Sequence, residues 1–403
     1  MTDSSYSSKQ IDLFNEMNGP HPLIIAEGAV RSGKTYAQAQ AFLVWALTSY
    51  PDGNFIIAGQ TVASVRRNVL NEMWRFLTSL GIKYKWDISK SEMRVGKATF
   101  VIVGAHTEKS QDRIQGLTAS GVLLDELVLL PRTFVMQALA RMSFDDSKMW
   151  CNLNPGPPSH WVKRDVYEGM NPKVYKFLMD DNPTLGEATK QRYRNMFTGV
   201  FYQRYVLGEW VAAEGQIYMT WHVGEPPGTT AVVSRDVAVD YATSSVFSAT
   251  VYEKHDNGKS YALREDYYDA RVDAPLTDEQ LVQRVVDLIG DNHIDTVIVD
   301  PNAASFKLTA RNRGLPVRDG NNDVLDGIRT TAGVLAVGDL VISDRCEHKL
   351  KEILSYMWHA DKQALGIDAP IKDNDHSMDE MRYYVMMRHQ QRILTAQPKP
   401  IGY

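Results

Sequence analysis

The chain has 403 residues and a formal net charge of −5, with 44% hydrophobic and 23% charged residues. This suits about two domains of ordinary globular composition, and the net charge gives no support for nucleic-acid binding. Its two cysteines, Cys151 and Cys346, lie far apart, which argues against a disulfide or zinc framework and fits a reducing compartment. From the polar first residues we expect no signal peptide. The apolar run 41–47 is far shorter than the about 18 residues of a membrane span.

In the first half of the chain, short apolar runs alternate with amphipathic stretches. Residues 36–50 and 64–80 have a helical pattern. Alternation of strands and helices favours a mostly parallel sheet with helices on both faces. The expected strands are residues 23–26, 55–59, 99–105, 121–126 and 149–154.

After the first expected strand, residues 28–35 read GAVRSGKT and match the phosphate-binding pattern G-x-x-x-x-G-K-[ST] in full. The glycines let backbone N–H groups face a phosphate, and the N-terminus of the following helix adds a partial positive charge. Lys34 is expected on the β/γ-phosphates and the Thr35 hydroxyl on Mg²⁺. We therefore predict an ATP site formed by Gly28, Arg31, Ser32, Gly33, Lys34 and Thr35.

A second part of such a site follows the expected strand at 121–126, which ends in two acids. Asp125 is expected to hold Mg²⁺, and Glu126 to polarise the attacking water. Without the phosphate-binding loop, two solvated acids would be the simpler interpretation. Gln10, upstream of the first strand, either reads the adenine edge or is a solvated side chain.

The pattern changes near residue 212, and a Gly/Pro cluster follows at 224–228. We therefore predict three parts: an ATPase domain (1–212), a linker (213–230) and a second domain (231–403). The second domain begins a new set of expected strands, with a helix at 276–290 inside the set. Those strands are residues 236–242, 247–254, 259–268 and 295–301.

Acids stand at the ends of two strands of this second set. Asp240 and Asp300 each end an apolar run, and a third acid is offered by Asp375 in a loop or by Asp379 near the start of a helical stretch. Neighbouring strands are about 4.8 Å apart, so paired strands would bring the first two carboxylates to one metal site. Two divalent ions in such a site are typical of phosphodiester hydrolysis. Asp236 competes for the first position, and helix caps or solvated charges are the structural alternative.

Several motifs occur in an order typical of one family: GAVRSGKT, GAHTEKSQDRIQGLTASGVLLDE, NLNPGPPSHWVKRDV, VIVDPNAASF and NDHSMDEMRYYV. Over nearly its whole length the chain resembles the large terminase subunit of tailed bacteriophages, a DNA-packaging ATPase and nuclease. The resemblance implies an α/β fold in two parts, an ASCE-type P-loop ATPase followed by an RNase H-like nuclease domain.

By motif match, the resemblance also implies residue roles. Arg31 joins the loop lysine in the phosphate role, Asp125 takes the metal role and Glu126 the base role. Either Asn152 or Asn154 falls where the family senses the γ-phosphate, and the sequence leaves that choice open. The nuclease triad maps onto Asp240, Asp300 and Asp379.

The resemblance implies double-stranded DNA, the portal protein and the small terminase subunit as partners. Its cofactors would be ATP with Mg²⁺ in the first domain and two Mg²⁺ or Mn²⁺ ions in the second. A homo-oligomeric ring is expected on the procapsid, with a monomer as the alternative for the isolated chain. The expected location is the host cytoplasm and, transiently, the procapsid portal, with no membrane and no secretion.

Contact with DNA should be mostly to the phosphate backbone, since a motor must move along any sequence. Candidate contacts are Arg66 and Arg67, or Lys163 and Arg164, with solvated helix faces as the alternative. A competing hypothesis is a P-loop translocase or helicase whose C-terminal domain is non-catalytic and binds partners. The acidic pair argues against a third hypothesis, a nucleotide switch, which has no need of a base beside its metal carboxylate.

Overall fold

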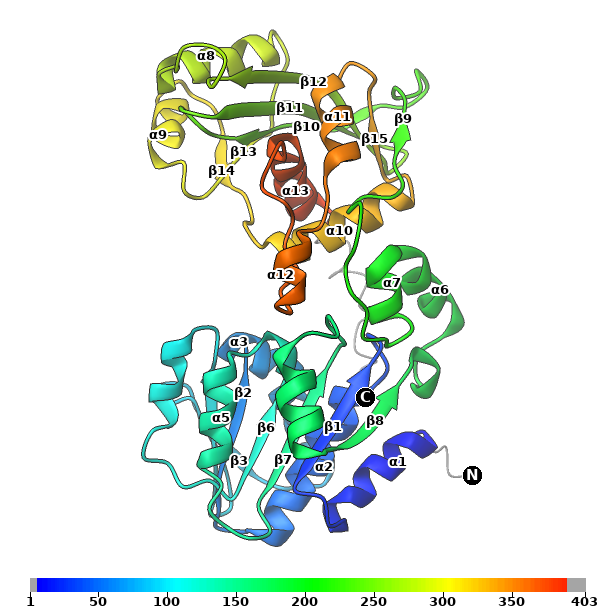
Figure 1. The fold of residues 1–403 in the computed structure, drawn as a ribbon, viewed down its shortest axis with the longest axis vertical. Coiled ribbons are helices and arrows are strands. Elements are labelled where there is room, and N and C mark those ends of the chain that lie inside the picture. The colour runs from blue at the N-terminus through cyan, green and yellow to red at the C-terminus, as the bar shows by residue number, and fades with distance from the viewer. Residues whose placement is uncertain (1–5, 390–403) are drawn as a thin grey trace. The chain divides into compact units, whose positions relative to one another are not determined.

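The computed structural model describes residues 6–389, which form two compact units, each with its own sheet (Figure 1). Within the described residues, no helix is both long and apolar enough to cross a bilayer. Of the described residues, the first unit comprises 6–194, 200–212 and 364–367, and the second comprises 195–199, 213–363 and 368–389.

The sheet of the first unit has eight strands in the order β3-β4-β5-β2-β6-β7-β1-β8. The six neighbouring strands β5, β2, β6, β7, β1 and β8 are all parallel. Strands β3 and β4 form an antiparallel hairpin at the edge, and β4 pairs with β5 in the antiparallel sense. Strand β7 lies between β1, which leads into the phosphate-binding loop, and β6, which ends before Asp125. The strand bounds are β1 Leu23–Gly28, β2 Asn54–Gly59, β3 Tyr84–Asp87, β4 Glu92–Val95, β5 Ala98–Gly104, β6 Gly121–Leu124, β7 Lys148–Leu153 and β8 Lys173–Phe177.

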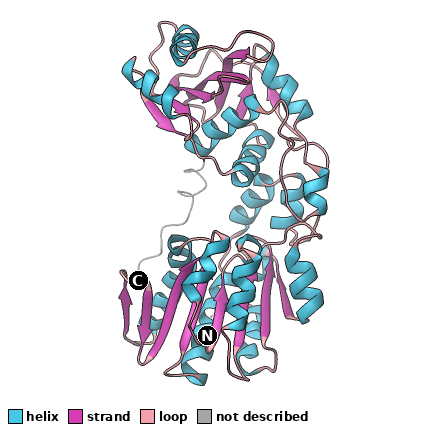
Figure 2. Ribbon diagram, turned by 60° about the vertical axis from the view of Figure 1, so that its left-hand side comes forward, coloured by secondary structure: helices cyan, strands magenta, loops and turns pink. Residues whose placement is uncertain are grey.

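Both faces of this sheet are covered, because the central strands are apolar on each side (Figure 2). Ile24 and Ile57 pack with helices α2 and α4 on one face, while Ile25 and Ile56 pack with α5 and η5 on the other. The helices are α1 Ser8–Asn15, α2 Lys34–Ser49, α3 Val62–Val65, α4 Asn71–Ser79, α5 Arg132–Ala140, α6 Glu187–Met196 and α7 Gly199–Tyr205. The 3₁₀ and π segments are η1 Glu16–Asn18, η2 Arg66–Leu70, η3 Glu108–Ile114, η4 Leu127–Leu129, η5 Val162–Glu168 and η6 Met179–Asp181.

The second unit has a seven-stranded sheet in the order β14-β13-β10-β11-β12-β15-β9. Strands β10, β11 and β12 are antiparallel neighbours, and β13 runs parallel to β10 with β14 parallel beside it. Three antiparallel strands followed by two parallel ones are the arrangement expected of an RNase H-like domain. The bounds are β9 His222–Val223, β10 Val232–Asp240, β11 Val246–His255, β12 Ser260–Asp269, β13 Thr296–Val299, β14 Val317–Asp319 and β15 Leu340–Ile342.

Helices cover this second sheet as well. An apolar core that includes Val237, Val282 and Phe306 joins one face to α8 and α9. On the other face, the rings of Tyr252 on β11 and Tyr384 on α13 stack with centroids 3.9 Å apart. The helices are α8 Asp278–Ile289, α9 Ala304–Asn312, α10 Val324–Ala336, α11 Glu347–Ser355, α12 Ala360–Ala364 and α13 His376–Arg388.

The helical stretch expected at 64–80 is divided into three segments. Helix α3 is followed by the π-helix η2 and then by α4. π-turns are uncommon and frequently occur at functional sites. The apolar periodicity predicted a helix here, but it contains no signal for the change in helical register.

Candidate active sites

The phosphate-binding loop between β1 and α2 requires both of its glycines. Gly28 has a φ of +134°, and a Cβ there would lie 1.9 Å from the carbonyl oxygen of Phe177. Gly33 has a φ of +81°, and a Cβ there would lie 2.5 Å from Nε2 of Gln10. Only glycine adopts such a backbone at these positions without strain or clash, so the motif forms a tight strand-to-helix turn.

Lys34, the first residue of α2, points back under this loop. Its Nζ donates to the carbonyl oxygen of Ala29 at 3.1 Å and to Oδ1 of Asn154 at 2.7 Å. The side chain is buried, and burial lowers the pKa of the ammonium, while the nearby Glu126 and Asp125 carboxylates oppose that shift. The ammonium is therefore held ready for an anion by amide and carbonyl oxygens.

Asp125, which follows β6, is held by two amides. Nδ2 of Asn152 donates to Oδ1 at 2.9 Å, and Nδ2 of Asn68 donates to Oδ2 at 3.1 Å. Burial raises the pKa of Asp125, and these two donors counteract the shift. A buried carboxylate at the end of a strand beside the loop is well placed to receive a divalent cation.

Glu126 adopts a left-handed conformation with a φ of 56°, which is uncommon for a residue with a side chain. Its backbone N–H donates to Oδ1 of Asn152 at 3.1 Å, and its Oε2 accepts from Nδ2 of Asn154 at 3.3 Å. Asn154 therefore bridges Glu126 and Lys34 through one amide, whereas Asn152 fixes Asp125 and the Glu126 backbone. Strain of this kind is concentrated at functional sites.

These different contacts predict different effects for the two asparagines. Asn154→Ala should lower the turnover of ATP hydrolysis by about 10²-fold, because Lys34 and Glu126 lose their common orienting group. Asn152→Ala should also lower the free energy of unfolding by about 1–3 kcal/mol, because Asp125 loses a buried donor. Phosphate release and thermal melting of both variants check this. Hydrolysis at the wild-type rate by Asn154→Ala would contradict it.

The other predicted loop residues have distinct surroundings. Arg31, with a φ of 58°, donates from Nε to the Tyr193 hydroxyl at 2.8 Å. Nε2 of the buried Gln10 donates to the carbonyl oxygen of Gly33 at 3.3 Å, so this amide supports the loop directly. Thr35 is half-buried in the first turn of α2.

The surroundings of the Ser32 hydroxyl indicate that the loop fits a phosphate. Its side chain is fully buried, and its Oγ has no hydrogen-bond partner among the described residues. A buried hydroxyl without a partner is costly. A phosphate oxygen in the loop would supply that partner, so the residues present fit a nucleotide.

In the second unit, pairing of β10 with β13 brings two predicted acids to one edge of the sheet. Val239 is opposite Val299, so Asp240 and Asp300 occupy equivalent positions at the ends of adjacent parallel strands. Oδ2 of Asp240 lies 2.9 Å from Nδ1 of His376 at the start of α13. Burial raises the pKa of Asp240, the His376 contact counteracts this, and the charge of Asp379 adds to the rise.

Helix α13 brings the third predicted acid and a contact to the second. The Tyr383 hydroxyl donates to Oδ2 of Asp300 at 3.0 Å. Nη2 of the buried Arg382 donates to Oδ1 of Asp379 at 2.7 Å, and Nζ of Lys372 donates to Oδ2 at 2.9 Å. Lys372 also lies 2.8 Å from Oδ2 of Asp375.

The three acids thus lie around one helix, but each has a protein partner. Between residues 6 and 389, no three His, Cys, Asp or Glu side chains are arranged closely enough to hold a metal ion. The donor chemistry suits a hard divalent cation, while the cations on Asp379 occupy its oxygens. Asp236, the competitor for the first position, is fully buried and receives two hydrogen bonds from Arg388. It is therefore engaged in a structural ion pair.

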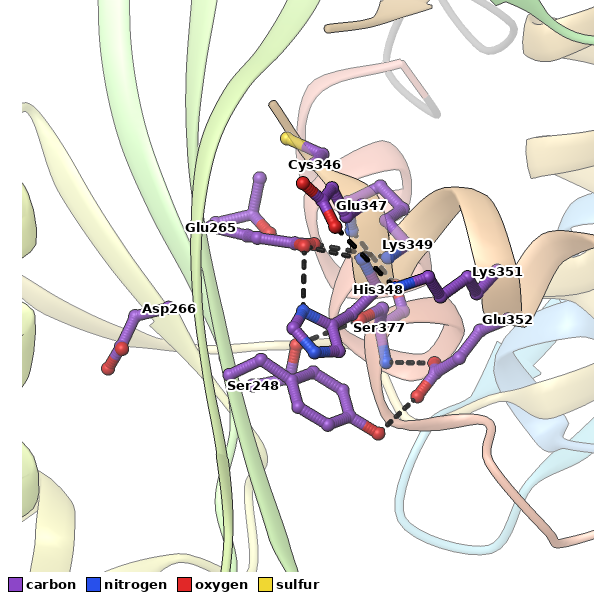
Figure 3. A network of polar contacts seen from close by, with 12 residues as sticks. Ser248, Glu265, Asp266, Cys346, Glu347, His348, Lys349, Lys351, Glu352 and Ser377 are labelled. Carbon is purple, nitrogen blue, oxygen red and sulfur yellow. Dashed lines mark hydrogen bonds and ion pairs between the residues drawn. The ribbon is translucent and has the colours of Figure 1, made fainter. Parts of the chain in front are cut away.

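A polar network behind α13 positions this helix (Figure 3). Oε2 of Glu352 on α11 accepts from the backbone N–H of Ser377 at 2.6 Å. Glu265 on β12 accepts from the backbone N–H groups of His348 and Lys349 at the start of α11. No local sequence pattern indicates these contacts, since each joins residues that are far apart in the chain.

Next to this network, Lys349 and Glu380 form a fully buried ion pair. The Glu380 carboxylate also accepts from the hydroxyls of Thr250 at 2.7 Å and Tyr252 at 2.9 Å. Burial raises the pKa of Glu380 to about 7 even beside the lysine ammonium. The carboxylate therefore depends on Lys349 to carry its charge.

Lys349→Met should destabilise the second unit by about 3–5 kcal/mol, because it leaves Glu380 buried without its cation. Without Lys349, the folded-state pKa of Glu380 rises further above its ordinary value of 4.5. Since the folded state then retains a proton that the unfolded state releases, stability should fall as the pH rises above that value. Denaturant melts at pH 5 and pH 8 measure both effects. The exposed Lys351→Met is the matched control, and equal melts of the two variants would contradict the prediction.

Comparison with solved structures identifies the family. The large terminase of a thermophilic bacteriophage is 35% identical to this chain, with a TM-score of 0.90 over 95% of this chain and 99% of that one. This chain belongs to the large terminase family of bacteriophages. Its two units have the predicted folds, a P-loop ATPase followed by an RNase H-like nuclease domain.

Further comparisons agree with this assignment. The same thermophilic phage's large terminase in complex with ADP is 34% identical, with a TM-score of 0.89 over 95% of this terminase and 99% of that chain. Its complex with ATP-γ-S is 34% identical, with a TM-score of 0.87 over 94% and 98%. The family described as "Terminase large subunit, T4likevirus-type, N-terminal" matches residues 25–221. No match was found among curated proteins.

Proposed function

We propose that this large terminase hydrolyses ATP to move double-stranded DNA into a procapsid and cuts concatemeric DNA with a metal-dependent endonuclease. The observation that carries the proposal is the bridge from Lys34 through Asn154 to Glu126. It joins the phosphate-binding cation to the candidate base in one hydrogen-bonded unit. The large terminase of the thermophilic phage, solved with ADP and with ATP-γ-S, supports a nucleotide in this unit.

In the proposed ATPase reaction, the loop and Lys34 hold the β- and γ-phosphates, and Glu126 orients and polarises the attacking water. Mg²⁺, when bound, would neutralise charge that develops on the phosphates, with Thr35 and Asp125 as its holders. Asn154 is our candidate for the residue that senses the γ-phosphate. When Lys34 turns from the amide to a phosphate, Asn154 loses one partner, and its hold on Glu126 changes with the nucleotide state.

In the proposed nuclease site, Asp240, Asp300 and Asp379 are the candidate holders of two Mg²⁺ or Mn²⁺ ions, which would stabilise the charge that develops during phosphodiester hydrolysis. Tyr383 positions Asp300, and His376 orients Asp240. The contacts of Asp379 with Lys372 and Arg382 do not fit a ligated carboxylate.

The proposed partners follow from the family: double-stranded DNA, the portal protein and the small terminase subunit. We propose that the chain forms a homo-oligomeric ring on the procapsid, with a monomer as the alternative for the isolated chain. The proposed location is the host cytoplasm. The proposed domain division is an ATPase domain (1–212), a linker (213–230) and a nuclease domain (231–403).

Packaging itself is the test. Procapsids that carry the portal protein are mixed with linear DNA, the small subunit, ATP and this chain, and DNase-resistant DNA is then counted. The wild type should protect DNA, and Lys34→Ala should protect none, because the loop loses its phosphate-binding cation. Protection that is independent of ATP or of Lys34 would contradict the motor role.

A further inference from the structure

A cavity of about 520 Å³ opens beside the first unit's helix α3 and the β3–β4 hairpin. It is lined on one side by the segment that follows β2 and on the other by residues of the hairpin. Neither the ATPase loop nor the acidic triad contributes to its lining. The residues that line it include Arg66, Arg67, Asn71, Trp86, Ile88 and Ser91.

The two arginines bring positive charge to the lining of this cavity. Arg66 and Arg67 are exposed, and neither forms an ion pair with a carboxylate in the part of the chain that the structure describes. Of the acids nearby, Glu72 pairs with Arg75 at 2.9 Å and Glu92 with Arg94 at 3.2 Å, while Asp87 on the hairpin accepts from the Ser89 hydroxyl and the Lys90 backbone N–H. The two adjacent guanidinium groups therefore keep hydrogen-bond donors available to solvent or to an anionic ligand.

Aromatic packing fixes one of these guanidinium groups. Cζ of Arg66 lies 5.8 Å from the centre of the Trp74 ring, a cation–π contact. Trp74 in turn stacks on Tyr84 at 5.9 Å and contacts Trp86 at 5.8 Å. A guanidinium held on an aromatic support loses less entropy when it binds an anion.

The other basic pair is engaged elsewhere. Lys163, unlike the exposed Arg66, is half-buried, and its Nζ lies 4.0 Å from the Tyr167 ring centre and 4.7 Å from that of Trp210. Arg164 donates from Nε to Asp165 at 2.7 Å. Of the two candidate pairs, Arg66 and Arg67 are thus the better placed to contact an external polyanion.

The same segment reaches the ATPase site. Asn68, the next residue of η2, donates from Nδ2 to Oδ2 of Asp125 at 3.1 Å. The charge of Arg67 also acts on the Asp125 carboxylate. A π-helical turn thus presents Arg66 and Arg67 to the cavity and Asn68 to the candidate Mg²⁺ holder.

We propose that this cavity binds backbone phosphates of double-stranded DNA, and that η2 transmits DNA occupancy to Asp125 through Asn68. The proposal rests on the proposed motor function and specifies where its ATPase unit contacts the substrate. Phosphate contacts by arginine carry no sequence information, as a motor requires. Engagement of the arginines shifts η2 and with it the Asn68 amide, so that DNA alters the rate of ATP hydrolysis.

The first test measures how DNA affinity depends on salt. The full chain is titrated onto a fluorescent duplex of about 30 base pairs in EDTA, which prevents cleavage, over a series of KCl concentrations. Each lost phosphate contact should reduce the slope of log K against log[salt] by about 1. Arg66→Ala/Arg67→Ala should therefore reduce the slope by about 2, equally for duplexes of different sequence.

Two further variants serve as controls for this titration. Arg66→Lys/Arg67→Lys keeps the charge and should keep most of the slope. Lys351→Ala/Lys362→Ala removes the same charge from exposed positions of the second unit and should leave the slope unchanged. An unchanged slope in the alanine pair, or an equal loss in the lysine control, would overturn the proposal.

The second test concerns the link to Asp125. Asn68→Ala should bind the duplex with the wild-type salt dependence. Its rate of ATP hydrolysis, however, should no longer increase when DNA is added. Stimulation equal to that of the wild type would overturn the link. A wild-type chain that does not bind DNA would overturn the proposed function and this proposal together, whereas a binding wild type with an unaffected arginine variant would overturn only the cavity.

Discussion

Glu126→Gln is expected to lower the turnover of ATP hydrolysis by about 10²–10⁴-fold, the usual contribution of a positioned general base. The amide keeps the size of the side chain and its contact with Nδ2 of Asn154, but it cannot accept a proton. ATP binding should persist, because the loop and Lys34 carry the phosphates. The left-handed backbone of Glu126, held by the Asn152 side chain, aims the carboxylate and is unchanged by the substitution.

Steady-state phosphate release measures the turnover, and titration with a fluorescent ATP analogue measures binding. Glu168→Gln removes an exposed carboxylate of the same unit and should hydrolyse ATP like the wild type. Hydrolysis by Glu126→Gln within a few-fold of the wild type would assign the base to another residue. Loss of ATP binding would instead give Glu126 a structural role.

Lys372→Ala is expected to tighten the binding of Mn²⁺ to the second unit by about tenfold or more, which corresponds to about 1.4 kcal/mol. The Lys372 ammonium lies 2.8 Å from Asp375 and 2.9 Å from Asp379. Burial would lower the pKa of this lysine, but the charges of the two carboxylates outweigh burial and raise it. A metal ion must therefore displace a charged competitor before it reaches Asp379.

Calorimetric titration of the full chain with Mn²⁺, in the absence of DNA and nucleotide, measures this affinity without relying on cleavage. Lys362→Ala, an exposed lysine on α12, is the matched control. Equal affinities for the wild type and both variants would show that Lys372 does not compete with the metal. A tighter Lys372→Ala variant would identify Lys372 as one feature that restrains metal binding at the proposed nuclease site.

Local chemistry made much of the ATPase site predictable. At Gly28 and Gly33 the positive φ values and the close neighbouring atoms together favour glycine, so these two residues specify the turn directly. Strand alternation likewise predicted the parallel strands β1, β2, β5, β6 and β7, since a strand buried on both faces is almost continuously apolar. The acid at the end of β6 then lies beside the loop because parallel strands end at the same edge.

Long-range contacts were beyond the reach of the sequence. Asn152 and Asn154 both match the position at which the family senses the γ-phosphate. Only the packing of β7 between β6 and β1 gives the two side chains different contacts. For Gln10 the sequence left an adenine contact and a solvated side chain open; its burial contradicts the solvated alternative, and its amide donates to Gly33, a contact that the sequence does not indicate. The cations on Asp379 come from Lys372 and Arg382, and no periodicity indicates that two cations share one carboxylate.

The most direct test of the central claim separates the two activities. Supercoiled plasmid is incubated with Mn²⁺ or Mg²⁺ and the wild type, Asp300→Asn or Lys34→Ala, and ATP hydrolysis is measured in parallel. Asp300→Asn should lose cleavage and keep ATP hydrolysis, while Lys34→Ala should do the reverse. If the wild type cuts with neither metal, or if Asp300→Asn cuts normally, the acidic triad is not a nuclease site and a translocase with a non-catalytic second domain becomes the better account.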